Sequence, residues 1–582
     1  MPKTVIPIYR KRLARERGTV RKDWGGKLSV ALIYPNLYRI GMSNLGFQVL
    51  YQLFNQRDDI VAERFFLPDK DELGIYQQSG KVLISLETQS PLPDFDLIAF
   101  SLSFENDYPH ILTILELGKI PLMARERDHH YPLVLAGGIT TFLNPEPLAQ
   151  FFDLFLLGEA EANLDWFLSQ FVEIVKTSGE KETLITDLVQ RTPHLYAPYF
   201  YAIQYKPDGT IHSRSILKRG LPDEIGVARQ PLTKIPVHQS SLLTPETEFG
   251  DKILVEVGRG CGRACRFCAA GYAYRPPRYH AEESLITSLE GSRQDCSSFG
   301  LLSASLSDSP GLDRMMEWII EREGDFSISS IRAETVTLKQ LQQLKAAGQK
   351  VVTLAPEAGS EGLRRVINKH LTDDQIIQAA KLTAKTGDFN LRLYFLIGFP
   401  KETSDDIEAI VRLVKSIRHQ IIKESKGRGT IGQIRLSINC FVPKPFTPFQ
   451  WFPMDDLKSL KEKQKSLRRN LSKVGGVSVT FDVPKWAYIQ ALLALGDRRV
   501  GHILLMAHRY KGNWGKAFRH SDVNPDFFVY RSKDYDEVLP WDFINHGLRK
   551  EFLIKEHKLS LRAEESDGCD VGNCDRCGIC TI

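Results

Sequence analysis

The feature that most constrains this chain is an apolar run that ends in a glycine loop carrying three cysteines. Four of the five residues 253–257 are apolar, and the run is followed by Gly258 and Gly260, a pattern typical of a buried strand that ends in a loop. Cys261, Cys265 and Cys268 follow directly. Thiolates are the usual ligands of iron–sulfur clusters, and three thiolates around a four-iron cluster leave one iron open. The alternative is part of a zinc site with a fourth ligand elsewhere.

Strand-like and helix-like segments alternate after this loop. Strands are predicted at 253–257, 301–305, 327–332, 351–355, 390–397 and 433–441, with helices between them, for instance at 282–289, 339–347, 373–385 and 405–421. Six such units predict a partial barrel of parallel strands, whose active site would lie at the carboxyl ends of the strands.

The first 200 residues show a similar alternation. Apolar runs at 28–34, 96–102, 133–137 and 153–157 predict a parallel sheet that is covered on both faces. Ligands of such sheets bind beyond the carboxyl ends of the strands. The residues that follow the predicted strands there are Gly41, Ser101, Ser103, Gly137, Gly138, Gly158 and Glu159. For any single one of them, an ordinary turn residue is the favoured alternative. Residues 201–217 predict a hairpin, and 220–249 a linker.

Composition limits the cellular setting. No apolar run approaches the ~20 residues that span a bilayer. The basic N-terminus lacks an apolar segment, so we expect an unstructured arm rather than a secretory signal. Seven of the nine cysteines fall into two clusters, which favours metal binding in a reducing compartment, and we expect a cytoplasmic protein. A net charge of +5 gives no argument for nucleic acid, and only residues 457–473 form a basic amphipathic helix.

A second cysteine cluster lies at the end of the sequence, at Cys569, Cys574, Cys577 and Cys580. Its x2 spacing is typical of a ferredoxin-like cubane cluster. A structural zinc site made by the same four thiols is the rival interpretation. A tail that joins an iron–sulfur site only with a partner is the third. Cys296 and Cys440 fall in or beside predicted core elements and are interpreted as apolar filler.

The cysteine loop, with Phe267 directly before Cys268, resembles the cluster loop of radical S-adenosylmethionine (SAM) enzymes. The resemblance implies a [4Fe–4S] cluster whose open iron binds the amino and carboxylate groups of SAM. One electron then cleaves SAM to methionine and a 5′-deoxyadenosyl radical. It also implies an electron donor of the flavodoxin or ferredoxin type.

Two further stretches, LRLYFLIGFPKET and SINCFVPKPFTPFQW, resemble segments of one branch of that family. The resemblance implies SAM contacts from Phe267, from Glu357 (ribose) and from Arg392 (carboxylate). Ser305 stands where many relatives carry a Gly-Gly-Glu that holds the SAM amino group. A carboxylate at a helix N-terminus is the alternative for Glu357, and an internal salt bridge is the alternative for Arg392.

The stretches YRIGMSNLGF, LAGGITTFLNPEPL and FLLGEAE resemble the cobalamin-binding domain that precedes the barrel in this branch. The family's cobalt-ligand signature Asp-x-His-x-x-Gly aligns with Asn36, Tyr38 and Gly41, so the histidine is missing, and tyrosine is a poor substitute for it. Either cobalamin binds without a protein ligand to cobalt, or the domain has lost it. The implied cobalamin contacts are Gly41, Ser101, Gly137, Gly138 and Gly158.

Together these features predict an α/β protein in four parts. They are a cobalamin-binding-type Rossmann-like domain (1–200), a hairpin and linker (201–250), a partial (β/α)6 radical SAM barrel (251–453) and a mainly helical extension with the cysteine tail (454–582). We expect a radical SAM enzyme that methylates its substrate if cobalamin is bound, and otherwise oxidises or rearranges it. A tRNA- or rRNA-modifying enzyme and a non-catalytic iron–sulfur protein are the alternatives.

Overall fold

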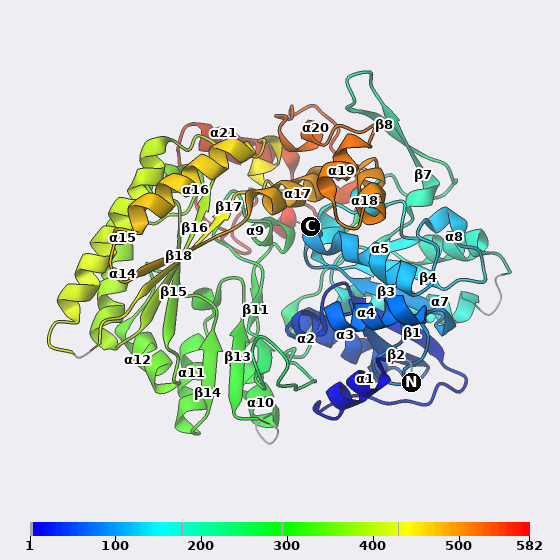
Figure 1. The fold of residues 1–582 in the computed structure, drawn as a ribbon, viewed down its shortest axis with the longest axis horizontal. Helices are drawn as coiled ribbons and strands as arrows, with labels where there is room; N and C mark the ends of the chain where they lie inside the picture. The colour runs from blue at the N-terminus through cyan, green and yellow to red at the C-terminus, as the bar shows by residue number, and fades with distance from the viewer. Residues whose placement is uncertain (1–3, 176–178, 293–295, 429, 582) are drawn as a thin grey trace.

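The computed structural model describes residues 4–175, 179–292, 296–428 and 430–581. It has two lobes side by side, each built around parallel strands, with the C-terminal helices bridging them along one edge (Figure 1). The C-terminus returns to the junction between the lobes. Among these described residues no helix is both long enough and apolar enough to cross a bilayer.

The first lobe contains a six-stranded sheet in the order β2-β1-β3-β4-β5-β6. Its strands are β1 (Leu28–Tyr34), β2 (Ile60–Phe66), β3 (Leu97–Ser101), β4 (Leu133–Gly137), β5 (Leu154–Leu156) and β6 (Leu195–Tyr196). All neighbours are parallel except β5 and β6. Every residue of β1, β2 and β3 is buried, so both faces of the sheet are covered. The parallel sheet predicted from the sequence is confirmed, and β2 and β6 are added to it.

Strand β2 escaped prediction because two charged residues interrupt its apolar run. Arg64 is fully buried between Glu16 and Glu87, with nitrogen–oxygen distances of 2.6 Å to each. Glu16 comes from the N-terminal segment, whose helix α1 (Ile6–Leu13) buries Tyr9 and Leu13. The expectation of an unstructured N-terminal arm was therefore wrong: the segment is ordered because its carboxylate neutralises a buried guanidinium.

The second lobe is an open barrel of seven parallel strands in two sheets. One sheet contains β10 (Ile253–Glu256), β13 (Ser298–Leu302) and β14 (Asp325–Ile328). The other contains β15 (Val351–Glu357), β16 (Asn390–Ile397), β17 (Ile434–Cys440) and β18 (Val477–Phe481). A hydrogen bond from the amide of Ile331 to the carbonyl of Thr353 (3.0 Å) links the two sheets.

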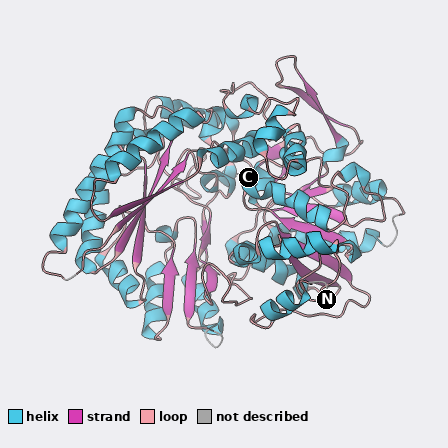
Figure 2. Cartoon of the chain, in the orientation of Figure 1, coloured by secondary structure: helices cyan, strands magenta, loops and turns pink. Residues whose placement is uncertain are grey.

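Helices follow these strands and cover the outside of the barrel (Figures 1 and 2). They are α10 (Glu282–Ser292), α11 (Leu312–Glu321), α12 (Leu338–Ala346), α14 (Asp373–Thr386), α15 (Ser404–Glu424), α16 (Leu457–Leu471) and α17 (Pro484–Leu495). Capping boxes at Thr337, Thr372 and Thr403 begin three of them. The alternation thus extends through α16 and β18, one strand beyond the six predicted.

Helix α16 is the basic helix noted in the sequence. Leu460, Leu467 and Leu471 are buried, and the lysines and arginines lie on the other side. The helix packs on α15, α17 and β18, which accounts for its amphipathic pattern without a nucleic acid.

The C-terminal region fastens the two lobes together. The side chain of Asn144, after β4, donates to the carbonyls of Ala494 (3.0 Å) and Gly496 (2.7 Å). Arg498 pairs with the buried Glu146 at 2.8 Å. The predicted hairpin is also confirmed, as β7 (Tyr201–Tyr205) and β8 (Ile211–Ile216).

Candidate active site

The cysteine loop connects β10 to the short helix α9 (Ala270–Ala273). Two hydrogen bonds shape it: the amide of Cys268 donates to the carbonyl of Cys265, and that of Gly271 to Cys268, both at 3.1 Å. Cys261, Cys265 and Cys268 are all free and partly exposed. The loop therefore presents three thiols at the carboxyl end of the first barrel strand, where the sequence placed them.

The chemistry of these thiols fits an iron–sulfur cluster better than zinc. Burial raises the pKa of Cys268 to about 12, and it raises the pKa of Cys265 against the opposing charge of Lys369. Among the described residues, no three thiol sulfurs lie within 4.8 Å of one another. A tetrahedral zinc with ~2.3 Å bonds would hold its sulfurs about 3.8 Å apart, whereas each thiolate of a cubane binds a different iron. The donor set suits a cluster, and the described thiols are not gathered as tightly as a tetrahedral zinc site requires.

Glu357 lies beside this loop. It has a left-handed backbone (φ 66°) at the carboxyl end of β15, where the pairing with β16 shifts register. Its carboxylate accepts a hydrogen bond from Lys369 at 3.3 Å. Burial alone would lower the pKa of Lys369, but Glu357 and the Cys265 thiol raise it. Lys369 therefore lies between Glu357 and Cys265, and strained backbone of this kind is typical of functional sites. Sequence reasoning missed Lys369, which carries no motif of its own.

Ser305 lies in the loop after β13, three residues beyond the end of the strand. It is buried, and its hydroxyl donates to Asp308 at 2.5 Å. Asp308 in turn accepts from Arg263 of the cysteine loop at 2.9 Å. The Ser305–Asp308 segment is thereby fixed to the loop between Cys261 and Cys265.

Phe267 lies near the carboxyl ends of the barrel strands, whereas Arg392 lies deeper in the barrel. The ring of Phe267 packs on Phe399 at 5.4 Å, at the edge of an apolar cluster near the carboxyl ends of the second barrel sheet. Arg392 is level with Thr353, whereas Glu357 is level with Phe395, three residues further along β16. At ~3.3 Å per residue this puts Arg392 about 10 Å below Glu357 along the barrel. Arg332 is the arginine whose charge acts on the Cys265 thiol.

A cavity of about 510 Å³ opens between the lobes. Residues from the carboxyl ends of the first sheet line one side of it, among them Ser101, Gly137, Gly138 and Gly158. Leu302, Gly260 and Ala270 line the other side. Gly260 directly precedes Cys261, and Ala270 begins α9. The carboxyl ends of both sheets and the cysteine loop therefore border one space of ordinary ligand-site volume.

Charged residues brace the rim of this cavity. Arg259, just before the cysteine loop, contacts Glu159 at 3.1 Å and both Glu161 and Glu256 at 2.8 Å. Burial would raise the pKa of Glu161, but His238 and Arg259 lower it overall. Glu159 and Glu161 belong to the GEAE motif that follows β5. This motif therefore joins the lobes. The role could not be predicted from the sequence, because the partner Arg259 lies about 100 residues away along the chain.

Tyr38, at the position of the family's cobalt-binding histidine, is not among the residues that line the cavity. Its ring is buried, and its hydroxyl donates to Glu16 at 2.5 Å. Burial and the Glu16 charge raise the pKa of Tyr38. Gly41 is explained by packing, since a Cβ there would lie 2.6 Å from the ring of Phe66. Four of the five residues predicted to contact cobalamin thus line the cavity, and Gly41 does not.

Asp107, in the short turn that follows β3, predicts that the stability of the protein depends on pH. Burial raises its pKa to about 7, while a 2.7 Å hydrogen bond from Asn36 opposes the shift. Between pH ~4 and 7 the folded protein therefore holds a proton that the unfolded chain lacks, and stability falls as pH rises through this window. We expect Asp107→Asn to remove this loss and to stabilise the protein at pH 8 by at most about 4 kcal/mol.

Urea unfolding of wild type and Asp107→Asn between pH 5 and 8 measures this effect. The exposed Asp94→Asn is the matched control and should leave the pH profile unchanged. Wild-type and Asp107→Asn curves that stay parallel across the window would contradict the prediction.

The tail cysteines pack against the cysteine loop, although the two are far apart in the sequence. The amide of Cys569 donates to the carbonyl of Gly262, next to Cys261, at 2.6 Å. Burial raises the pKa of Cys569, Arg275 opposes this, and the thiols of Cys577, Cys574 and Cys580 raise it further. The four tail thiols therefore gather in one place, beside the loop. As with the loop thiols, no three of these described sulfurs lie within 4.8 Å of one another.

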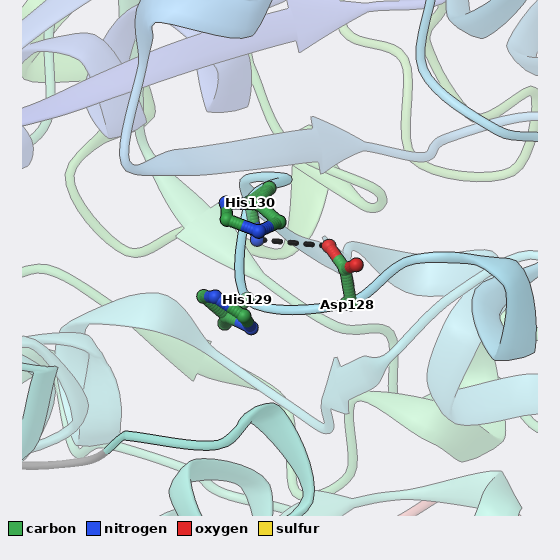
Figure 3. A group of neighbouring side chains, drawn as sticks. All are labelled: Asp128, His129 and His130. Atoms are coloured by element: carbon green, nitrogen blue, oxygen red, sulfur yellow. Dashed lines mark hydrogen bonds between the residues drawn. The ribbon is translucent and has the colours of Figure 1, made fainter.

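Another group of potential metal ligands lies elsewhere. Asp128, His129 and His130 form the one group within the described ranges that brings three such atoms within 4.8 Å (Figure 3). All three are exposed, and an oxygen of Asp128 already accepts the amide of His130 at 2.9 Å. They precede β4, at the amino end of the sheet, so they lie opposite to the edge that borders the cavity.

Two family models match the two lobes. Residues 255–414, which carry the cysteine loop and most of the barrel, match the radical SAM superfamily. The chain belongs to the radical SAM superfamily. Residues 46–198 match the N-terminal region of radical SAM proteins. Enzymes of the radical SAM superfamily use a [4Fe–4S] cluster and SAM and in general need an electron donor, and this chain is a radical SAM enzyme.

Individual relatives are distant. The "Uncharacterized protein MJ0966" of Methanocaldococcus jannaschii is 27% identical over 82% of this chain and 90% of its own length. An "Uncharacterized methyltransferase" of Pyrococcus horikoshii is 28% identical, over 32% of this chain and 42% of its own length. Among solved structures, the radical SAM methyltransferase TsrM of Kitasatospora setae, with cobalamin and a [4Fe–4S] cluster bound, gives a TM-score of 0.45 at 13% identity. That match covers 71% of this chain and 72% of TsrM.

Proposed function

We propose that Cys261, Cys265 and Cys268 hold the [4Fe–4S] cluster and that the enzyme directs its radical into the cavity between the lobes. The observation that carries this proposal is the position of the cysteine loop: Gly260 and Ala270, on either side of the three cysteines, line the cavity. When bound, the cluster supplies the electron that cleaves SAM to methionine and a 5′-deoxyadenosyl radical. A substrate in the cavity would offer a hydrogen atom to that radical.

The chain's own residues would bind and orient SAM. Lys369 holds Glu357 at the carboxyl end of β15 and lies beside Cys265, so Glu357 is favoured for a polar contact to the SAM ribose. Arg332, whose charge reaches the same thiol, is better placed for the SAM carboxylate than Arg392, which lies deeper in the barrel. Phe267 offers an apolar surface beside the cluster. Ser305 keeps its oxygen as an acceptor for an ammonium group.

Methyl transfer through cobalamin is the second candidate. It is favoured by the position of Ser101, Gly137, Gly138 and Gly158 on the cavity wall, at the carboxyl edge where ligands of doubly wound sheets bind. Tyr38 is buried and hydrogen-bonded, so a cobalamin here would bind without a ligand from that position.

Anaerobic reconstitution followed by incubation with SAM and dithionite tests the proposal. We expect iron and sulfide to be incorporated and methionine and 5′-deoxyadenosine to be formed, as measured by mass spectrometry. The same protein before reconstitution is the control. Iron incorporation without any 5′-deoxyadenosine would contradict the proposal and favour a non-catalytic iron–sulfur protein. Cobalt bound after growth with cobalamin would select methyl transfer over plain hydrogen abstraction.

A further inference from the structure

The four tail cysteines have two sides with different surroundings. Cys577 is buried, and its carbonyl accepts from the amide of Arg549 at 2.9 Å. Cys574 is partly exposed and lies among exposed residues, 570–573 and 575. Cys569 contacts the catalytic loop through the 2.6 Å hydrogen bond to Gly262. One side of the group thus faces solvent, and the other faces the loop.

Several hydrogen bonds fix this tail to the loop. The side chain of Asn368 donates to the carbonyls of both Ala264 in the loop (3.2 Å) and Ser566 in the tail (3.1 Å). It also accepts the amide of Ser566 at 2.8 Å. Arg266, between Cys265 and Phe267, donates to the carbonyl of Glu564 at 2.8 Å. These hydrogen bonds hold the tail in a fixed position relative to the cysteine loop.

Arg275 links the two cysteine groups directly. It is buried, and its Nε donates to the carbonyl of Gly271, at the end of the cysteine loop, at 2.7 Å. The thiols of Cys577 and Cys569 lie close enough to raise its pKa, and Cys577 also forms a hydrogen bond with it. A buried cation beside these two thiols offsets the negative charge that they carry as metal ligands.

We propose that Cys569, Cys574, Cys577 and Cys580 bind a second [4Fe–4S] cluster that relays electrons from a protein donor to the catalytic loop. The inference rests on the proposed function and adds the route of the electron. With all four irons ligated, the second cluster has no open position for SAM and suits electron transfer. The side at Cys574 would receive the electron, and the side at Cys569 would pass it on.

The electron count of the route is simple. One electron from a reduced flavodoxin or ferredoxin enters the tail cluster and passes to the loop cluster. It is then consumed as the sulfur–carbon bond of SAM breaks into methionine and the 5′-deoxyadenosyl radical. Each SAM cleaved therefore oxidises the donor by one electron and returns both clusters to their oxidised resting state.

The test compares wild type with Cys574→Ala/Cys580→Ala, using dithionite or a reduced bacterial flavodoxin as the electron source. We expect iron to fall from about eight to about four per chain in the variant. With dithionite, 5′-deoxyadenosine formation should stay within about twofold of wild type, whereas with flavodoxin it should fall at least about tenfold. Cys296→Ala, which removes a thiol outside both groups, should behave as wild type with both reductants.

Cluster reduction by flavodoxin, followed by electron paramagnetic resonance, gives a readout that does not need SAM cleavage. Slow reduction of the loop cluster in the tail variant alone supports the relay. About four irons and one zinc in wild type would overturn it and make the tail a structural zinc site. Equal rates of loop-cluster reduction by flavodoxin in wild type and variant would also overturn it. So would a loss of 5′-deoxyadenosine formation in the variant that is equally large with both reductants. Failure of wild type to cleave SAM with dithionite, by contrast, contradicts the proposed function, and the reduction rates still decide the relay.

Discussion

Replacing Cys265 with alanine is expected to abolish SAM cleavage and to lower the iron content by about four atoms per chain. The thiol lies at the centre of the loop, beside Lys369 and the other two cysteines. Loss of one of three protein ligands leaves two irons of the cluster without a thiolate, so the cluster is not retained. The fold should persist, because Cys265 is partly exposed and carries little of the core.

Iron and sulfide analysis, with 5′-deoxyadenosine formation under dithionite, measures the effect. Cys296→Ala is the matched control: it also removes a partly exposed thiol, but one that lies outside both cysteine groups, and it should keep iron and activity. The tail should still hold its four irons in Cys265→Ala if it forms a separate cluster. Unchanged iron in Cys265→Ala would contradict assignment of the loop as the cluster site.

The second large effect is expected from Arg266→Leu. Arg266 is completely buried, and its guanidinium contacts Glu556 at 3.1 Å. It also donates to the carbonyls of Arg365 (3.1 Å), Val366 (3.0 Å) and Glu564 (2.8 Å). Removal leaves a buried carboxylate and three carbonyls short of a donor, and breaking a buried ion pair in this way costs about 3–5 kcal/mol. Iron retention should fall as well, since the same side chain ties the loop to the tail.

Denaturant unfolding and iron content after reconstitution measure these changes. The double variant Arg266→Leu/Glu556→Leu removes the stranded carboxylate and should recover a substantial part of the lost stability. The iron content of the double variant separates the contribution of Arg266 to stability from its role in tying the loop to the tail. Recovery of stability without recovery of iron would show that the guanidinium positions the loop. A single variant as stable as wild type would refute the argument from its buried contacts.

Much of the fold could be predicted from the sequence, because its signals are local. The apolar runs of β1, β4 and β16 match the structure at both ends, and the three loop cysteines are neighbours in sequence. A ligand set contained in one short loop needs no tertiary information to be recognised. The same holds for the alternation of strands and helices, which reports which faces are buried.

The less local features were harder to predict. Strand β2 carries Glu63 and Arg64, and the charge of Arg64 is tolerated only because Glu16 and Glu87 reach it from other segments. The seventh barrel strand, β18, alternates like a strand, but only its pairing with β17 places it in the barrel. In both cases the deciding partner is far away in the chain.

The sequence by itself determined the chemistry: a three-cysteine loop after a barrel strand, and a four-cysteine tail. Only the tertiary structure decided what these groups face. Folding brings Cys569 against Gly262, more than 300 residues away, and places the carboxyl ends of two separate sheets around one cavity. It also turns Tyr38 into the core and sets Arg392 below the level of Glu357. The physical reason is that ligand identity is a property of the side chain, whereas proximity depends on how buried surfaces and paired charges assemble the whole chain.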